Sequence, residues 1–235
     1  MCLQPKFILG ERHVYGAEAL ARWRRPDGTI LPPAYFMDPL EKIGYITELD
    51  FYIFEEVLKT LDKWERQKRR KLVISTNFSG RHFDTDGEEF LNRIQHIFSK
   101  YTVPAEYVEI EVTEGVLVKN VHVLERCVNR LHEMGFRVSI DDFGTGYSSL
   151  SVLADMPADV VKIDKSFINK DMNGKKMDIL YEIGRMVKIL QKDIIIEGVE
   201  TEEQEKLLIN GGFTCGQGYL CNKPIPIGEF EKLYL

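Results

Sequence analysis

The stretch VSIDDFGTGYSSL, residues 138–150, places two adjacent carboxylates at the end of an apolar run. Successive side chains of a β-strand point to opposite faces, so Asp141 and Asp142 cannot both face one site while the strand stays regular. Neighbouring carboxylates also repel each other and resist burial unless positive charge compensates them. We therefore expect the strand to end at Asp141, Asp142 to swing in from the loop, and a positive species to bind there.

Apolar, β-rich runs alternate with helical patterns along nearly the whole chain. We predict strands over residues 3–9, 14–20, 72–77, 107–112, 137–141, 160–163 and 194–197, and a short one near Phe213. Apolar residues three or four positions apart predict helices between them, including stripes from Phe54 to Trp64, from Leu124 to Met134 and from Ile179 to Leu190. In 235 residues this alternation predicts an α/β fold, a modified TIM (β/α)8 barrel.

The first two predicted strands lie too close together for a helix to fit between them. The segment LGERHV, residues 9–14, suits a hairpin turn, so one strand near the N-terminus is expected to run antiparallel to the others. No linker, repeat or low-complexity segment divides the sequence. We therefore expect residues 1–235 to form a single domain.

Composition narrows the classes of partner and compartment. The net charge of −6 argues against attraction to a nucleic-acid polymer or an anionic membrane. The four cysteines form no CxxC pair, which favours reduced thiols in the cytoplasm. No apolar stretch approaches the roughly 18 residues that a membrane span needs. We expect a cytoplasmic protein, or the cytoplasmic domain of a membrane-bound one.

Polar residues recur where the apolar runs stop. In a TIM barrel the C-terminal strand ends form one rim, where active sites lie. Taken singly, each such residue also fits a strand that simply reaches solvent, but this explanation weakens when it must hold for the whole set. Carboxylate and amide oxygens favour Mg²⁺ or Mn²⁺ over zinc. The residues concerned are Glu18, Asn77, Glu111, Asp141, Lys162, Asp164 and Glu197.

Several motifs resemble those of the EAL domain, in order and in spacing. The resemblance extends from residue 3 to residue 219, which makes coincidence an unattractive explanation. The motifs are LQPKF (3–7), EALARW (18–23), NFS (77–79), EVTE (111–114), DDFGTGYSSL (141–150), KID (162–164), EGVET (197–201) and GQGY (216–219).

The resemblance implies a phosphodiesterase that opens cyclic di-GMP (c-di-GMP) to linear 5′-pGpG with two divalent cations, Mg²⁺ or Mn²⁺. It assigns the first cation to Glu18, Asn77, Glu111 and Asp141, with Asp141 bridging to a second cation beside Asp142. Glu197 matches a position described either as metal-associated or as general base, and the sequence leaves both roles open. Ca²⁺ is expected to inhibit, because its looser coordination positions water badly.

Other residues are assigned to catalysis and to substrate. Glu18 and Arg22 are four positions apart on a segment read as extended, so Arg22 would face the same side and reach a phosphate oxygen. Lys162 would orient or help deprotonate the attacking water, or stabilise developing negative charge. The alternative for Lys162 is an internal ion pair with Asp164. The resemblance places Gln4, Asp164 and Gln217 near the substrate.

Glu114 should lie past its strand end, and the resemblance makes it the anchor of the loop that carries Asp142. Gly144 and Gly146 permit unusual backbone angles, while the hydroxyls of Thr145, Ser148 and Ser149 can tether the loop. The resemblance also places a homodimer contact beside residues 141–150. Glu109 faces the same side as Glu111, one layer deeper, without an identifiable partner.

Two alternatives to an active phosphodiesterase belong to other classes. One is a catalytically silent c-di-GMP receptor or protein-interaction module, although such members usually lack metal ligands and none is missing here. The other is an unrelated metal-dependent TIM-barrel lyase. The family usually places a helix before the first strand, whereas this chain begins almost at it. We therefore expect either a domain of a larger signalling protein, with upstream sensory or cyclase domains, or a short stand-alone enzyme.

Overall fold

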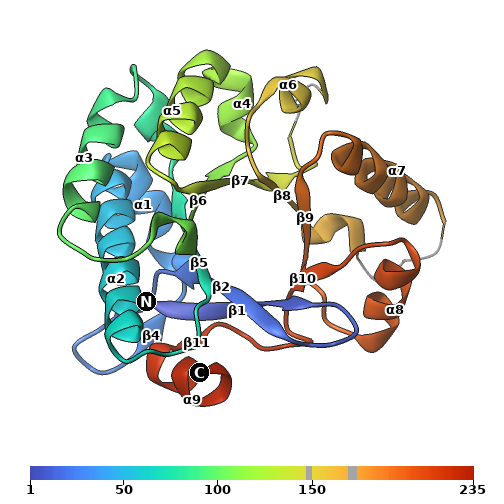
Figure 1. Ribbon diagram of the computed structural model, residues 1–235, viewed down its shortest axis with the longest axis horizontal. Helices are drawn as coiled ribbons and strands as arrows, with labels where there is room; N and C mark the ends of the chain where they lie inside the picture. The colour runs from blue at the N-terminus through green and yellow to red at the C-terminus, as the bar shows by residue number, and fades with distance from the viewer. Residues whose placement is uncertain (147–149, 169–173) are drawn as a thin grey trace.

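The computed structural model describes residues 1–146, 150–168 and 174–235. A closed ring of eight strands lies at its centre, surrounded by helices (Figure 1). The ring strands are β1 (Cys2–Ile8), β2 (Val14–Leu20), β5 (Val73–Phe78), β6 (Val108–Thr113), β7 (Arg137–Phe143), β8 (Val160–Ile163), β9 (Asp193–Glu197) and β10 (Cys215–Gln217). β1 pairs antiparallel with β2 and β10, and the other neighbouring ring strands pair in parallel. The predicted barrel with one antiparallel strand is confirmed.

The helices surround the ring, and their buried faces follow the predicted stripes closely. Cys127 and Leu124 are fully buried, as their spacing predicts. Ile179 is the exception: it is 51% exposed, so the buried stripe of its helix runs through Leu180 and Val187 instead. The helices are α1 (Met37–Lys42), α2 (Ile46–Arg66), α3 (Glu88–Phe98), α4 (Gly115–Lys119), α5 (Val121–Glu133), α6 (Leu150–Asp155), α7 (Lys175–Ile189), α8 (Glu202–Asn210) and α9 (Ile227–Tyr234).

The hairpin between β1 and β2 leaves the outside of β1 without a crossover helix. The chain's end supplies the cover: β11 (Ile225–Pro226) pairs with β1 outside the ring, and α9 lies next to it (Figure 1). Phe230 of α9 is fully buried and stacks on Trp64, with ring centroids 6.1 Å apart. The Trp64 indole N–H also donates to Glu231 at 2.8 Å. A separate short ribbon joins β3 (Trp23–Arg24) to β4 (Ile30–Leu31).

The interior of the ring is polar, while the apolar core lies between the strands and the helices. Ile110 and Val112 face outward and are buried under the helices. Burying charged groups is unfavourable unless they are paired, so the interior must hold compensating charges. The buried polar residues of the ring strands are Lys6, Glu18, Ser75, Thr76, Glu109, Glu111, Ser139, Asp141, Lys162 and Gln217.

Among the described residues, the helices are all too short or too polar to serve as a bilayer span.

Candidate active site

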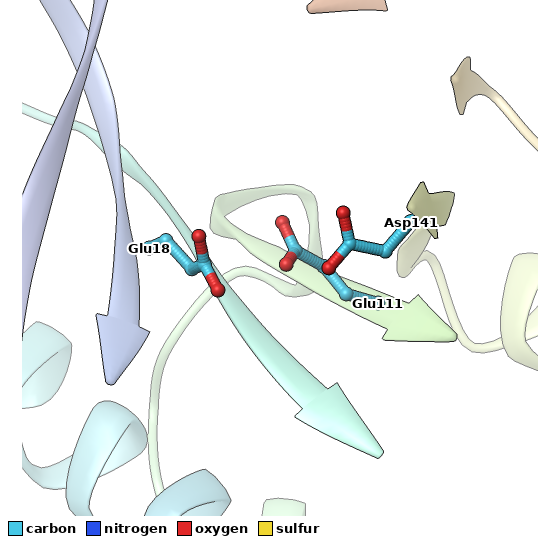
Figure 2. Close-up of side chains that lie close together, drawn as sticks. All are labelled: Glu18, Glu111 and Asp141. Atoms are coloured by element: carbon cyan, nitrogen blue, oxygen red, sulfur yellow. The ribbon is translucent and has the colours of Figure 1, made fainter. Parts of the chain in front are cut away.

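Side chains from separate strands meet at the carboxyl end of the parallel strands. Glu18 comes from β2, Glu111 from β6 and Asp141 from β7, and the three point toward one another (Figure 2). One carboxylate oxygen of each lies within 4.8 Å of the others. All three residues are buried. The convergence follows from the barrel, because it brings the ends of neighbouring parallel strands to one rim.

Lys162 of β8 is the centre of this cluster. Its Nζ lies 2.9 Å from Glu111 Oε2, 2.9 Å from Glu197 Oε1, 3.0 Å from Asp141 Oδ1 and 3.3 Å from Glu18 Oε2. Burial lowers the pKa of Lys162, but the four carboxylates outweigh burial and raise this pKa well above its ordinary value. Asp164 is not one of the four, so within the described part of the chain the alternative Lys162–Asp164 pair is not formed.

The lysines stabilise the negative charges of the clustered carboxylates to different extents. Burial alone would raise the pKa of Glu111, but attraction to Lys162 and Lys6 outweighs it and holds this pKa at about 2. Burial raises the pKa of Asp141 well above its usual value, and the neighbouring carboxylates add to the effect. Burial likewise raises the pKa values of Asp142 and Glu197. Without a further cation, the cluster therefore holds more negative charge than Lys162 can balance.

A β-bulge explains how two adjacent carboxylates reach one site. The prediction that the strand ends at Asp141 is wrong, because β7 continues to Phe143. Ile140 pairs with Val161 and Phe143 with Ile163, so Asp141 and Asp142 together stand opposite Lys162 alone. Asp142 adopts φ +55°, a left-handed conformation that Asp tolerates better than most residues. Oxygens of Asp141, Asp142 and Glu197 consequently come within 4.8 Å of one another.

Two side-chain amides bind Glu18 from either side. Asn77 Nδ2 donates to Glu18 Oε1 at 2.7 Å, and Gln217 Nε2 donates to Glu18 Oε2 at 2.6 Å. Gln217 also reaches Gln4 Oε1 at 3.4 Å. In this orientation Asn77 presents its NH₂ group, and the amide would have to turn to offer Oδ1 to a cation. Gln217 Oε1 is buried and has no hydrogen-bond partner among the described residues, which leave this acceptor of the site unused.

A cleft of about 240 Å³ opens above the cluster, and Lys165 and Tyr219 lie on its wall. Asp164 reaches this cleft from just beyond β8 and accepts the Ser166 amide at 2.8 Å. The cleft also contains most of the residues assigned to cation and substrate by sequence, namely Gln4, Glu18, Asp142, Asp164, Glu197 and Gln217.

Arg22 lies elsewhere. β2 ends at Leu20, so the extended segment that would carry Arg22 onto the face of Glu18 stops before it. Its guanidinium donates to the Ala21 carbonyl at 2.7 Å, and the side chain lines a hollow of about 480 Å³ with Trp23 and Tyr35. A phosphate contact by Arg22 stays a prediction.

Glu114 accepts two backbone amides from the loop that follows β7. Its Oε2 lies 2.9 Å from the Gly144 amide and 3.0 Å from the Gly146 amide. Thr145 donates its hydroxyl to the Asp142 carbonyl at 2.9 Å. Gly144 has φ +96°, and a Cβ there would lie 2.3 Å from the Phe167 ring. Ser148 and Ser149, the other expected tethers, lie outside the described residues.

The sequence did not predict the contacts that Lys6 makes below the carboxylate cluster. Lys6 Nζ bridges Glu109 Oε1 and Glu111 Oε1, each at 2.8 Å, and so supplies the partner that Glu109 lacked. Burial lowers the pKa of Lys6, but Glu109 and Glu111 outweigh it and raise this pKa. Side-chain alternation along β1 could have predicted this contact, because it places Lys6 on the same inward face as Gln4.

Comparisons with known proteins identify the fold and its family. The profile described as the EAL domain matches residues 1–224. The chain belongs to the EAL-domain family. This EAL domain is 36% identical over 99% of its length to the signalling protein YkoW of Bacillus subtilis, and 32% identical over 97% to the cyclic di-GMP phosphodiesterase NbdA of Pseudomonas aeruginosa. It spans 29% of the length of each of these relatives.

A solved structure of the PaMucR phosphodiesterase in complex with c-di-GMP superimposes with a TM-score of 0.90 and 30% identity. That match covers 97% of the EAL domain and 92% of the PaMucR chain. The EAL enzyme Bd1971, solved with cAMP and cyclic di-GMP bound, gives a TM-score of 0.91 at 30% identity, and the match covers 64% of that chain. The EAL domain is therefore similar to proteins named as phosphodiesterases and to structures that contain c-di-GMP.

Proposed function

We propose that this EAL domain hydrolyses c-di-GMP to linear 5′-pGpG with the help of two divalent cations. The observation that carries the proposal is the convergence of Glu18, Glu111, Asp141 and Glu197 on Lys162 at one rim of the barrel. Relatives named as cyclic di-GMP phosphodiesterases and a c-di-GMP complex at 30% identity support the choice of substrate.

The donor set fits Mg²⁺ or Mn²⁺. The clustered groups are hard oxygen donors, and one ammonium group faces four carboxylates. The second group of close oxygens, from Asp141, Asp142 and Glu197, shares Asp141 with the first. A pair of cations can stabilise both the attacking and the leaving oxygen of an in-line displacement. We propose Glu18, Asn77, Glu111 and Asp141 for one cation, and Asp141 and Asp142, with Glu197 close by, for the other.

The remaining assignments follow the position of each side chain. Lys162 stands inside the carboxylate cluster and stabilises negative charge that develops there. Gln217 and Gln4 offer amide groups at the cleft floor, Asp164 lies on its wall, and Arg22 reaches a substrate phosphate only after its side chain turns from Ala21. We also propose a cytoplasmic location and a homodimer contact near residues 141–150. Because the chain spans 29% of YkoW and NbdA, upstream sensory or cyclase domains are proposed as well.

Product analysis tests this function. Purified protein incubated with c-di-GMP and Mn²⁺ or Mg²⁺ is expected to release 5′-pGpG, because the proposed ligand positions carry carboxylates and one amide that can turn its oxygen to a cation. Excess EDTA is expected to abolish product, and Ca²⁺ to support binding without turnover. Binding of c-di-GMP in Mn²⁺ without any product would favour the receptor alternative instead.

Loop anchoring is tested in the same assay with Glu114→Gln. The carboxylate accepts two amides, and its charge-assisted bonds are worth about 1.5–3 kcal/mol, so a fall in rate of about tenfold or more is expected. Glu229→Gln, at an exposed glutamate of α9, is the control and should keep the wild-type rate. Unchanged rate and metal affinity in Glu114→Gln would show that the anchoring of this loop by Glu114 does not affect the cation proposed beside Asp142.

A further inference from the structure

The two oxygens of Glu111 face different lysines. Oε2 lies 2.9 Å from Lys162, in the cluster that also contains Glu18 and Asp141. Oε1 lies 2.8 Å from Lys6, on the other side of the carboxylate. Glu111 therefore turns one oxygen toward the proposed cation site and has the other held from the barrel interior.

Lys6 has little freedom to release that oxygen. It is only 1% exposed, and its second contact, to Glu109 Oε1 at 2.8 Å, fixes the ammonium group between two carboxylates of β6. Glu109 is in turn buried, with Arg137 4.0 Å away from its Oε2. The charge on Glu109 thus compensates Lys6, while Lys6 holds Glu111.

The number of oxygens that a carboxylate offers matters to the choice of cation. Mg²⁺ demands near-octahedral geometry with few protein oxygens, whereas Ca²⁺ takes six to eight oxygens and accepts bidentate carboxylates. Groups that orient a metal ligand change metal affinity by about 10–100-fold when they are removed. A glutamate restricted to one free oxygen therefore disfavours Ca²⁺ more than Mg²⁺.

We propose that Lys6 is a positioning residue that sets the cation preference of this site, by holding Glu111 Oε1 so that only Oε2, which faces the carboxylate cluster, is presented to a cation. This inference rests on the proposed function, since it requires that Glu111 be a metal ligand. The backbone of Lys6 pairs with Gln217, but among the described residues its ammonium group contacts Glu109 and Glu111 and does not line the cleft, so the charge of Lys6 acts on the site through Glu111.

The double variant Lys6→Met/Glu109→Gln tests the proposal without leaving the Glu109 carboxylate buried and unpaired. Dissociation constants for Mg²⁺ and for Ca²⁺ are measured by calorimetry on metal-free protein. The ratio Kd(Mg²⁺)/Kd(Ca²⁺) is expected to rise by about tenfold or more over wild type, because Glu111 can then turn and offer both oxygens. Glu109→Gln alone is the matched control and should keep the wild-type ratio, since Lys6 still holds Glu111.

Three results would overturn the proposal. Equal losses of affinity for both cations would show that Lys6 has only a structural role. The same shift in the Glu109→Gln control would assign the effect to Glu109. If the wild-type protein binds neither cation, the proposed metal-dependent function fails together with this inference. The first two results, in contrast, overturn the role of Lys6 and leave the proposed function standing.

A measurement on wild-type protein covers the case in which the double variant does not fold. In a crystal structure with Mg²⁺ bound, Glu111 is expected to bind the ion through Oε2 alone, with Lys6 still in contact with Oε1. A Glu111 that binds Mg²⁺ through both oxygens, or a Lys6 that has left Oε1, would contradict the proposal.

Discussion

Glu18→Ala is expected to lower kcat/KM for c-di-GMP by about a thousandfold or more, equivalent to about 4 kcal/mol of lost transition-state stabilisation. Among the described carboxylates, Glu18 alone contacts Lys162, Asn77 and Gln217 together, so its loss disconnects the amides from the cluster. The fold should survive, because Lys162 keeps three other carboxylates. Steady-state kinetics on c-di-GMP in Mn²⁺ measure the effect.

Glu11→Ala is the control for this substitution, because Glu11 is exposed in the turn between β1 and β2. It should keep the wild-type kcat/KM and the wild-type affinity for Mn²⁺. A Glu18→Ala protein that retains more than about a tenth of the activity would show that the cluster is not the reactive centre.

Lys162→Met is expected to have the largest effect on stability. It leaves four carboxylates crowded at the barrel rim without their shared cation, and breaking a buried ion pair in this way costs about 3–5 kcal/mol. For a chain of this size, that corresponds to a fall in Tm of about 10 °C in metal-free protein. Hydrolysis should fall as well, because the charge inside the cluster is lost.

Divalent cations should rescue the stability of this variant. Saturating Mg²⁺ or Mn²⁺ supplies the missing positive charge, so the rise in Tm on adding metal is expected to be larger for Lys162→Met than for wild type. Lys206→Met, at an exposed position of α8, should match wild type with and without metal. Calorimetric melting curves with EDTA and with each cation decide this. An equal rise in both proteins would mean that the cations bind away from Lys162.

The barrel and its rim were predictable because they depend on simple periodicities. Glu18, Glu111 and Asp141 each lie within two residues of the end of a strand that the apolar runs predict, and the barrel brings such ends together regardless of loop detail. The short turn between residues 9 and 14 likewise predicts the hairpin that makes β1 antiparallel. The chain's last elements, β11 and α9, were not foreseen, because covering β1 is a tertiary requirement with a weak local signal.

The details of the site depended on features that periodicity does not encode. Nothing in DDF distinguishes a strand that ends from one that bulges, because the difference is the backbone angle of Asp142. Arg22 was misplaced because β2 stops two residues before it. Strand alternation predicts that Lys6 faces the interior of the ring. Its partner Glu109 is 103 residues away in the sequence, however, and only the closed ring shows that the two side chains meet.

The most direct test of the central claim is a crystal structure of the protein grown with Mn²⁺, with the ions located by anomalous scattering. Two Mn²⁺ ions are expected at the barrel rim, one bound by Glu18, Glu111 and Asp141 and the other beside Asp142. If Mn²⁺ is absent from these residues in such crystals, or bound only elsewhere, the account of a metal-dependent active site is contradicted.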